Sequence, residues 1–193
     1  GNGVIIAAPS SNPAADRTIT LPSTADGTML TTTNPKAGNI IQVLQTVKTD
    51  TFSTTSTSAT DVTGLSVSIT PASASNKILV TYDVKASCEN VQMSFFLVRG
   101  STTIYVGNGD GNRIRVSSLV LGTLNSQNSE TYRGIPQMHA CFLDSPSTAS
   151  AITYKIQCQV NSDTGYVNRS GDDADQNYRA RSASSITVME VAA

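Results

Sequence analysis

The chain has 193 residues and a formal net charge of −1, and its hydrophobic and charged fractions are 38 % and 14 %. This near-neutral charge argues against nucleic-acid binding, which needs a basic surface to release counterions. The sequence also has no run of 18 or more apolar residues that would indicate membrane insertion. Serine and threonine make up roughly a quarter of the residues, which favours an all-β protein over a helical one.

Residues 1–38 differ in composition from the rest of the chain. They hold four of the seven prolines, and their apolar stretches (GVIIAA, TITL and TML) are only three to six residues long. Such stretches bury too little apolar surface to offset the entropy of folding alone. We interpret 1–38 as an extended stem or docking segment that folds when copies from neighbouring chains wind together, with a flexible leader as the alternative. Because residue 1 is not methionine, we also expect a longer or processed polypeptide.

Residues 39–193 show the two-residue alternation of half-buried strands. It is clear where a Ser/Thr-rich run leads into Leu65, Val67 and Ile69, and again in 77–88 and 152–160. No stretch has convincing helical periodicity. Roughly eight to ten strands in about 155 residues predict an antiparallel, jelly-roll-like β-sandwich over 39–193.

Three stretches are apolar on both faces of the predicted strand: 91–100, 135–144 and 184–193. In a two-layer sandwich one face of a strand normally meets water, so a neighbouring subunit is the simplest cover for the second face. We therefore expect an oligomer. Alternation also puts Ile41, Val43 and Val47 on one face of a strand near residue 40.

The cysteines and the single histidine lie in strand-like runs. We expect Cys88, Cys141 and Cys158 to be buried free thiols, with one disulfide and an odd thiol as the alternative. We expect His139 to be packed and hydrogen-bonded. The alternatives are a catalytic pair with Cys141 or a metal ligand on an axis shared by three copies.

No motif identifies an enzyme. Asp173, Asp175 and Asn177 have the opening spacing of a calcium loop, but its sixth and twelfth positions are Tyr178 and Ser184 instead of Gly and Glu. Phosphate-loop and dinucleotide motifs are absent, and nothing pairs the acidic residues for glycoside hydrolysis. We expect no enzymatic activity, no cofactor and no bound metal.

Several stretches resemble a family of tail-fibre and other virion-surface proteins of tailed bacteriophages, particularly marine ones. The stretches are 49–80 (TDTFSTTSTSATDVTGLSVSITPASASNKILV), 95–107 (FFLVRGSTTIYVG), 142–157 (FLDSPSTASAITYKIQ) and 166–193 (YVNRSGDDADQNYRARSASSITVMEVAA). RTITLP and DGTML also resemble segments near the distal end of phage fibre shafts. The resemblance implies a homotrimeric fibre that ends in a knob, exposed on the virion and contacting the host surface.

The expected function is therefore that of a structural virion protein, the distal domain of a trimeric phage tail fibre. It would bind a host-surface glycan or an outer-membrane protein. The alternative is a capsid decoration protein or head fibre, anchored to other virion proteins through 1–38. A polysaccharide depolymerase and a cellular adhesin or lectin are further alternatives.

Receptor contacts are expected from two loops, 107–115 and 163–181, because loops on a rigid β scaffold commonly carry binding residues. The two loops concentrate Gly, Asn, Asp, Arg and Tyr. The candidate contact residues are Asp110, Arg113, Tyr166, Asn168, Arg169, Asp173, Tyr178 and Arg179.

Overall fold

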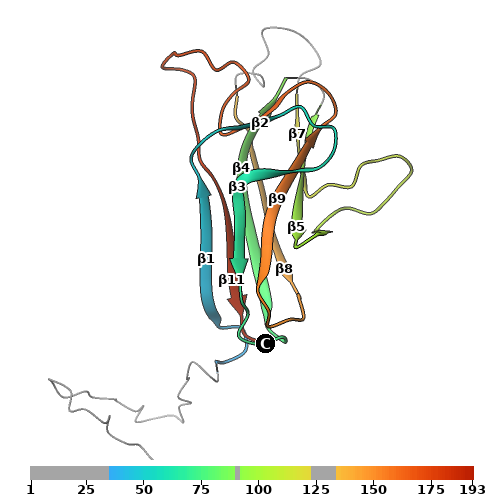
Figure 1. Cartoon of the computed structure of the whole chain (residues 1–193), viewed down its shortest axis with the longest axis vertical. Helices are drawn as coiled ribbons and strands as arrows, with labels where there is room; N and C mark the ends of the chain where they lie inside the picture. Colours follow the sequence, from blue (N-terminus) through green and yellow to red (C-terminus); the bar gives the residue numbers. More distant parts are fainter. Residues whose placement is uncertain (1–34, 90–91, 123–133) are drawn as a thin grey trace, which may run out of the picture. The chain divides into compact units, whose positions relative to one another are not determined.

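The computed structural model describes residues 35–89, 92–122 and 134–193. The chain divides into two units, Gly1–Asn34 and Pro35–Ala193. The stem expected over 1–38 lies outside the described residues except for its last four, so it stays a prediction. The second unit is a β domain, shown in colour in Figure 1.

The described residues form eleven strands. In chain order these are β1 (Ile40–Lys48), β2 (Phe52–Thr54), β3 (Thr60–Ile69), β4 (Lys77–Cys88), β5 (Gln92–Arg99), β6 (Thr102–Ile104), β7 (Ser118–Leu121), β8 (Gln137–Asp144), β9 (Ile152–Val160), β10 (Gly165–Val167) and β11 (Ser184–Val191). Strands β2, β6 and β10 have three residues each. The other eight make up the body of the domain.

The strands form two antiparallel sheets. The first, here called the β1 sheet, has the order β1-β11-β4-β10-β2, with β8 also paired to β4. The second, the β3 sheet, has the order β3-β9-β5-β6, with β7 also paired to β5. Among the eight longer strands, every connection except β5 to β7 passes from one sheet to the other. This is the arrangement of a jelly roll, so the all-β, jelly-roll-like prediction is confirmed.

The core lies between the two sheets and follows the predicted alternation. Leu65, Val67 and Ile69 on β3 are buried, as expected. Beside them in the same sheet, β9 contributes Tyr154, Ile156 and Cys158, and β4 of the opposite sheet contributes Ile78, Val80, Tyr82 and Val84. Each large apolar side chain buried in this way stabilises the fold by about 1.5–3 kcal/mol.

A buried ionic cluster also joins the two sheets. Asp144, at the end of β8 in the β1 sheet, accepts hydrogen bonds from Arg99 Nη1 at 2.8 and 3.0 Å and from the Tyr154 hydroxyl at 2.6 Å. Arg99 and Tyr154 belong to β5 and β9 of the β3 sheet. Burial, and then the hydrogen bond to Asp144, raise the pKa of Tyr154. The hydroxyl therefore stays protonated and keeps donating to the carboxylate.

The two ends of the domain differ. At the end we call the base, the chain enters at Pro35–Asn39 and leaves at Ala192. Gly38 N donates to Ala192 O, and Ala192 N donates to Asn39 O, both at 2.9 Å. At the opposite end, the tip, β2 and β10 meet the loop 168–183 (Figure 1). The domain is therefore connected to residues 1–34 at the end opposite to that loop.

Three sequence expectations need correction. Phe96 and Val98, on the outer face of β5, are buried within this chain, so no neighbouring subunit is needed to cover that strand. His139 is exposed rather than packed, and Cys141 is exposed as well. Both residues share the outer face of β8, which alternation alone cannot distinguish from its core face.

The other two cysteines behave as predicted. Cys88 and Cys158 are buried free thiols, and all three described cysteines are free. Burial raises the pKa of Cys88 to about 11 and that of Cys158 to about 12. Both thiols therefore remain protonated at neutral pH and act as small apolar core residues.

Candidate functional site

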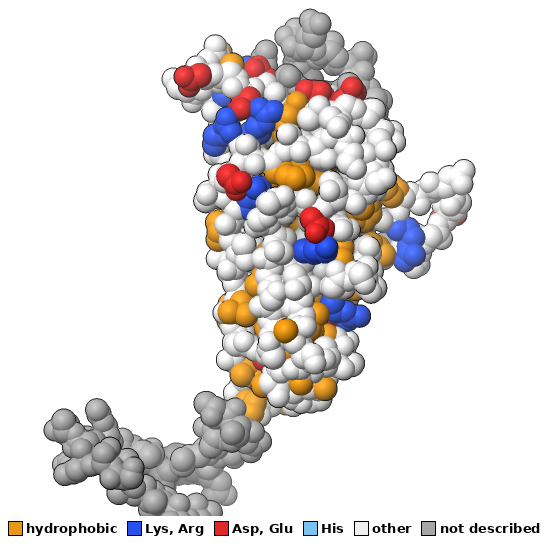
Figure 2. Space-filling view, in the orientation of Figure 1, with side chains coloured by type: hydrophobic (Ala, Val, Ile, Leu, Met, Phe, Trp, Pro, Cys, Tyr) orange, Lys and Arg blue, Asp and Glu red, His pale blue; other side chains and the backbone are white. Residues whose placement is uncertain are grey.

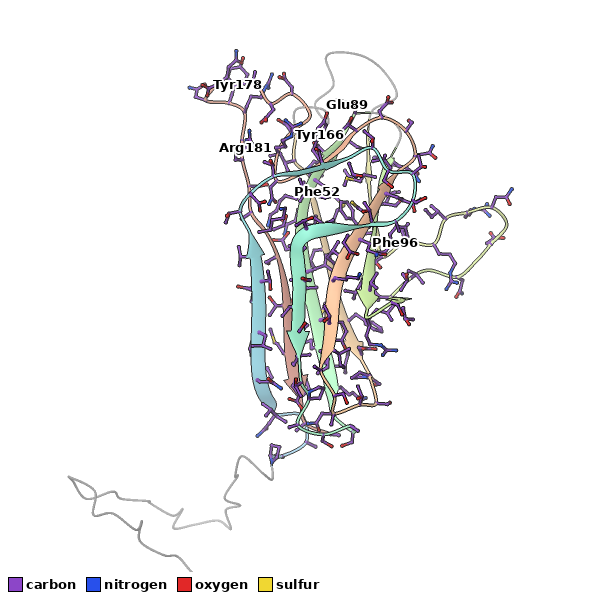
Figure 3. All side chains as sticks on the ribbon, in the orientation of Figure 1. Phe52, Glu89, Phe96, Tyr166, Tyr178 and Arg181 are labelled. Carbon is purple, nitrogen blue, oxygen red and sulfur yellow. The ribbon has the colours of Figure 1, made fainter. Side chains whose placement is uncertain are left out.

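Most of the predicted contact residues lie at the tip, on β10 and the loop 168–183. Residues Gly165–Val167 of β10 pair with Phe52–Thr54 on one side and with Ala86–Cys88 on the other. This double pairing holds the start of the loop rigidly. Figure 3 shows Tyr166, Glu89, Arg181 and Tyr178 gathered at this end of the domain.

Tyr166 lies beneath the loop and supports it. It alternates with core-facing Val167, so its ring is on the outer face of the β1 sheet. Its hydroxyl donates to Glu89 Oε1 at 2.5 Å, and the Arg169 guanidinium lies 4.0 Å from the ring centroid. Tyr166 is largely buried by these contacts, and burial followed by the hydrogen bond to Glu89 raises its pKa. It positions Arg169 rather than offering its own hydroxyl to a ligand.

Asn168 is a structural residue. It is 0 % exposed and has a φ of +64°, a left-handed conformation that asparagine tolerates better than most residues. Its Nδ2 donates to the carbonyl oxygens of Lys48 and Asp50, each at 2.9 Å, and its Oδ1 accepts from Ser184 Oγ at 2.6 Å. Because its amide is fully used inside the domain, we withdraw Asn168 from the contact residues.

The rest of the loop is closed by arginine–aspartate pairs. Asp173 Oδ2 accepts from Arg169 Nη1 at 2.7 Å and from Arg181 Nη2 at 2.6 Å. Arg179 pairs with Asp172, and its guanidinium lies 4.7 Å from the ring centroid of Tyr178. These pairs turn a glycine- and aspartate-rich segment into a cross-braced loop.

Tyr178, which is 65 % exposed, and Arg181 are open to solvent, as are the smaller polar side chains of Asp175, Gln176 and Asn177. A solvent-facing tyrosine beside a guanidinium can stack on a ligand and donate hydrogen bonds to it. The sequence prediction included Tyr178 but missed Arg181. The two-residue spacing of Arg179 and Arg181, opposite Asp172 and Asp173, was the signal that could have identified it.

Asp110 and Arg113 lie elsewhere, on the 105–117 loop between β6 and β7. Asp110 Oδ2 accepts from Arg113 Nη1 at 2.6 Å, and the two side chains are 77 % and 76 % exposed. Figure 1 shows this loop projecting from the side of the domain, away from the loop 168–183. The predicted contact residues therefore form two separate groups rather than one site.

The 105–117 loop borders an open pocket of about 420 Å³ on the β3 sheet. Its lining comes from the loop, from the strands β5 and β9, and from the residue after β9: Gln92, Asn112, Arg113, Ile114, Gln159 and Asn161. Amide groups that converge in this way can donate hydrogen bonds to ligand hydroxyls and accept hydrogen bonds from them, and the guanidinium can donate. Sequence reasoning missed the strand residues because Gln92 and Gln159 look like ordinary outward-facing positions.

Two features are absent from the described part of the chain. It contains no group of three or more His, Cys, Asp or Glu side chains placed to hold a metal ion. It also contains no helix that is long and apolar enough to cross a membrane.

Comparison with known proteins gives no family assignment. No protein-family description matches the sequence, and no curated protein is significantly similar to it. Two similar solved structures are the infectious bursal disease virus Gt strain, with a TM-score of 0.40 and 12 % identity, and the VP2 subviral particle of that virus, with 0.36 and 11 %. Each similarity covers 92 % of this chain but only 42 % of the other. At such scores the likeness carries no argument about what this chain does.

Proposed function

We propose that this chain is a structural protein of a virus particle, which displays its jelly-roll domain on the particle surface and acts by binding rather than by catalysis. The observation that carries the proposal is that the base and the tip lie at opposite ends of the domain. The chain enters and leaves at the base, where Gly38 bonds to Ala192, and the braced loop 168–183 lies at the other end (Figure 1). A domain connected in this way can hold its tip outward from the particle.

The finer proposal is the distal domain of a homotrimeric phage tail fibre. The sequence resemblance to phage tail-fibre and virion-surface proteins supports it. Its ligand would be a host-surface glycan or an outer-membrane protein, contacted by Tyr178 and Arg181 at the tip and by the amide-lined pocket beside the 105–117 loop. Three copies would raise a modest affinity per site through multivalency.

A capsid decoration protein is the second candidate, and the fold favours it. The jelly-roll arrangement of the eight longer strands is used by viral capsid domains and by lectins. In this version residues 1–38 hold other virion proteins, and the same domain faces outward from the capsid.

Immunogold electron microscopy of particles that carry the chain, using antibodies against residues 35–193, tests both versions. Label at fibre ends supports the tail-fibre proposal, and label over the capsid supports decoration. Intact particles that take up no label, although the antibody binds the purified protein, would overturn the proposal of a virion-surface protein.

The tip is tested by competition between the purified chain and intact particles for host cells. We expect Tyr178→Ala and Arg181→Ala each to weaken competition at least tenfold, because a loss of about 1.4 kcal/mol at a single contact is already tenfold. Lys36→Ala, which removes one exposed positive charge at the base, is the matched control. Equal competition by all four proteins would exclude the tip as the binding site, and Arg113→Ala then tests the pocket in the same assay.

A further inference from the structure

The outer face of the β1 sheet, which is turned away from the core, is apolar near the base. Val43 on β1 pairs with Met189 on β11, Met189 with Leu79 on β4, and Leu79 with Leu143 on β8. One row of four apolar side chains therefore crosses all four strands. We call this row, together with its apolar neighbours on the same face, the outer apolar face; the neighbours are Ile40, Val47 and Val191.

Four of these side chains are exposed in the described domain, and Leu79, Met189 and Val191 are half-buried. Ile40 is 55 % exposed, Val43 and Val47 are each 53 % exposed, and Leu143 is 46 % exposed. The next row toward the tip, Gln45, Thr187, Thr81 and Cys141, carries no charge either. Single exposed apolar residues are common, but a continuous apolar patch across four strands marks an interaction surface.

Strand β1 adds a second feature to this face. Among the described strands it forms a backbone ladder only with β11, so the backbone of its other edge is unpaired, although Thr46 Oγ1 and Gln42 Nε2 donate to the carbonyl oxygens of Ser66 and Thr70. It has nine residues and no proline, and its one charged residue, Lys48, is buried. Edge strands of monomers are usually protected by exposed charges, prolines or bulges that block pairing with another chain. β1 has a bulge only at its start, between Ile40 and Gln42.

We propose that the outer apolar face is buried against a second copy of this chain. The two rows through Val43 and Gln45 carry no charge; Lys77, beside Val191, and Asp83, beside Ser185, lie at their margins. Uncharged rows suit identical partners, because two copies bring the same charges and a charged surface would repel itself. The sheet is also large enough. Four strands about 4.8 Å apart and about nine residues long form a face of roughly 19 Å by 30 Å, which is of the order of the roughly 800 Å² per partner in a standard interface.

The position of the face favours a second copy as well. Ile40 follows directly on the base, where residues 1–34 of each copy join the domain at Pro35. Any association between the N-terminal segments of neighbouring copies brings their outer apolar faces to a high effective concentration. This inference rests on the oligomeric part of the proposed function and is independent of what the tip binds.

Cys141 provides a native probe of this surface. It is the exposed cysteine in the row beside Thr81, whereas Cys88 and Cys158 are buried in the core. In the full chain we expect a solution mass that is a multiple of 20.2 kDa by light scattering. In the same sample we expect maleimide to label Cys141 slowly. Intact-mass spectrometry measures the labelling rate.

The decisive variant is the double substitution Val43→Asp with Leu143→Asp, which places like charges on both sides of the face. We expect the mass to fall towards 20.2 kDa and Cys141 to label about tenfold faster or more, because thiol reactivity follows access. Leu121→Asp is the matched control: Leu121 is an exposed leucine on β7 of the other sheet, and its substitution should change neither reading.

A second variant keeps the test decisive if the double variant fails to fold. Val43→Cys is a small change, and a bismaleimide should cross-link it between copies to give covalent oligomers on a denaturing gel. Leu121→Cys should give none. An oligomer that shows fast Cys141 labelling and no cross-link at position 43 would overturn the inference while leaving the proposed function intact.

A monomer at every concentration would overturn both the inference and the oligomeric part of the proposed function. Slow labelling of Cys141 in such a monomer would mean that the chain's own residues cover the face. That outcome also contradicts a second copy as the occupant.

Discussion

The outer faces of the two sheets differ although both sheets share one core. On the β3 sheet, Ser68 Oγ and Thr153 Oγ1 lie 2.7 Å apart, and Lys155 and Gln157 donate to Asp61 at 2.9 and 2.7 Å. Figure 2, with β3 and β9 in front, shows a surface that is mainly white, where charged side chains occur as red and blue neighbours. On the β1 sheet the corresponding positions include Val43, Met189, Leu79 and Leu143.

This difference shows that two-residue alternation specifies only which side chains share a face. The polar outer face can satisfy its own side chains across strands and meet water. The apolar outer face gains free energy only when something covers it. The outward residues therefore indicate which surface is solvated and which is used for assembly.

The largest expected effect comes from the contact that joins the two sheets, independently of either outer face. Asp144→Ala leaves the Arg99 guanidinium and the Tyr154 hydroxyl without their buried partner, and should lower the free energy of unfolding by about 3–5 kcal/mol. Urea denaturation measures this loss. Asp110→Ala, which breaks a fully solvated ion pair with Arg113, should have no measurable effect. Similar losses in both variants would contradict a structural role for the cluster.

Glu190, at the base end of the β1 sheet, should give the next largest effect. Its carboxylate is buried and accepts from Gln42 Nε2, Asn76 Nδ2 and Ala72 N at 2.5, 2.6 and 2.7 Å. Burial alone would raise the pKa of Glu190, but these hydrogen bonds outweigh it and hold the pKa below its usual value. Glu190→Gln should cost about 2–3 kcal/mol at pH 7, because charged hydrogen bonds are lost and an amide N–H₂ faces the donors.

The pH dependence of that effect has a defined sign. Because the folded pKa of Glu190 is lowered, its stabilisation is complete above the unfolded value of about 4.3 and is lost as the pH falls through the folded pKa. The stability difference between the wild type and Glu190→Gln should therefore shrink below about pH 4.3. Parallel urea titrations from pH 7 to pH 3 check this, and a constant difference over the range would count against it.

A smaller effect is expected where β10 of the β1 sheet approaches the β3 sheet across the core. A Cβ on Gly165 would lie 2.7 Å from both Met93 Sδ and Val160 Cγ1. Gly165→Ala should therefore destabilise the domain by about 1–2 kcal/mol, the lower part of the overpacking range, since methionine can move but valine is stiff. Gly107→Ala is the control, because nothing lies within 4 Å of its Cβ position. Thermal unfolding followed by circular dichroism compares the two.

The smallest effect should come from the polar outer face of the β3 sheet. The pKa of Asp61 is lowered chiefly by its hydrogen bond from Lys155 and then by that from Gln157. Since Asp61 is about half exposed, solvent screening reduces this contribution, and Asp61→Asn should cost about 0.5 kcal/mol or less. The loss should shrink further in 1 M salt. A cost as large as that of Glu190→Gln would remove the distinction between a solvated face and a buried contact.

The core could be predicted from the sequence because its signal is local. Leu65, Val67 and Ile69 alternate without interruption, and the residues of β4 do the same. The orientation of β1 could not be predicted, because a bulge between Ile40 and Gln42 shifts its register and an edge strand carries apolar residues on either face. Val43 and Val47 share a face as expected, but that face is the outer one.

The tip shows a similar limit. Loop composition selected Arg169, Asp173, Tyr178 and Arg179, which the structure brings together in the loop 168–183, and their role as ligand contacts stays a prediction. Loop composition could not show that Asn168 is buried, because its partners Lys48 and Asp50 are 120 and 118 positions away. Contacts across such sequence separations leave no local pattern.

The bonding of Gly38 to Ala192 at the base has a further consequence for how the chain can be rearranged. Strands β1 and β11 are neighbours, and the ends of the domain are held together by two backbone hydrogen bonds. A short linker from Ala193 to Pro35 would therefore allow a circular permutant, with new termini opened near Gly107 in the exposed 105–117 loop. Such a molecule would keep every strand pairing of the jelly roll while its N-terminus emerged at the side of the domain. Residues 1–34, reattached there, would be separated from the outer apolar face without the loss of a single core contact.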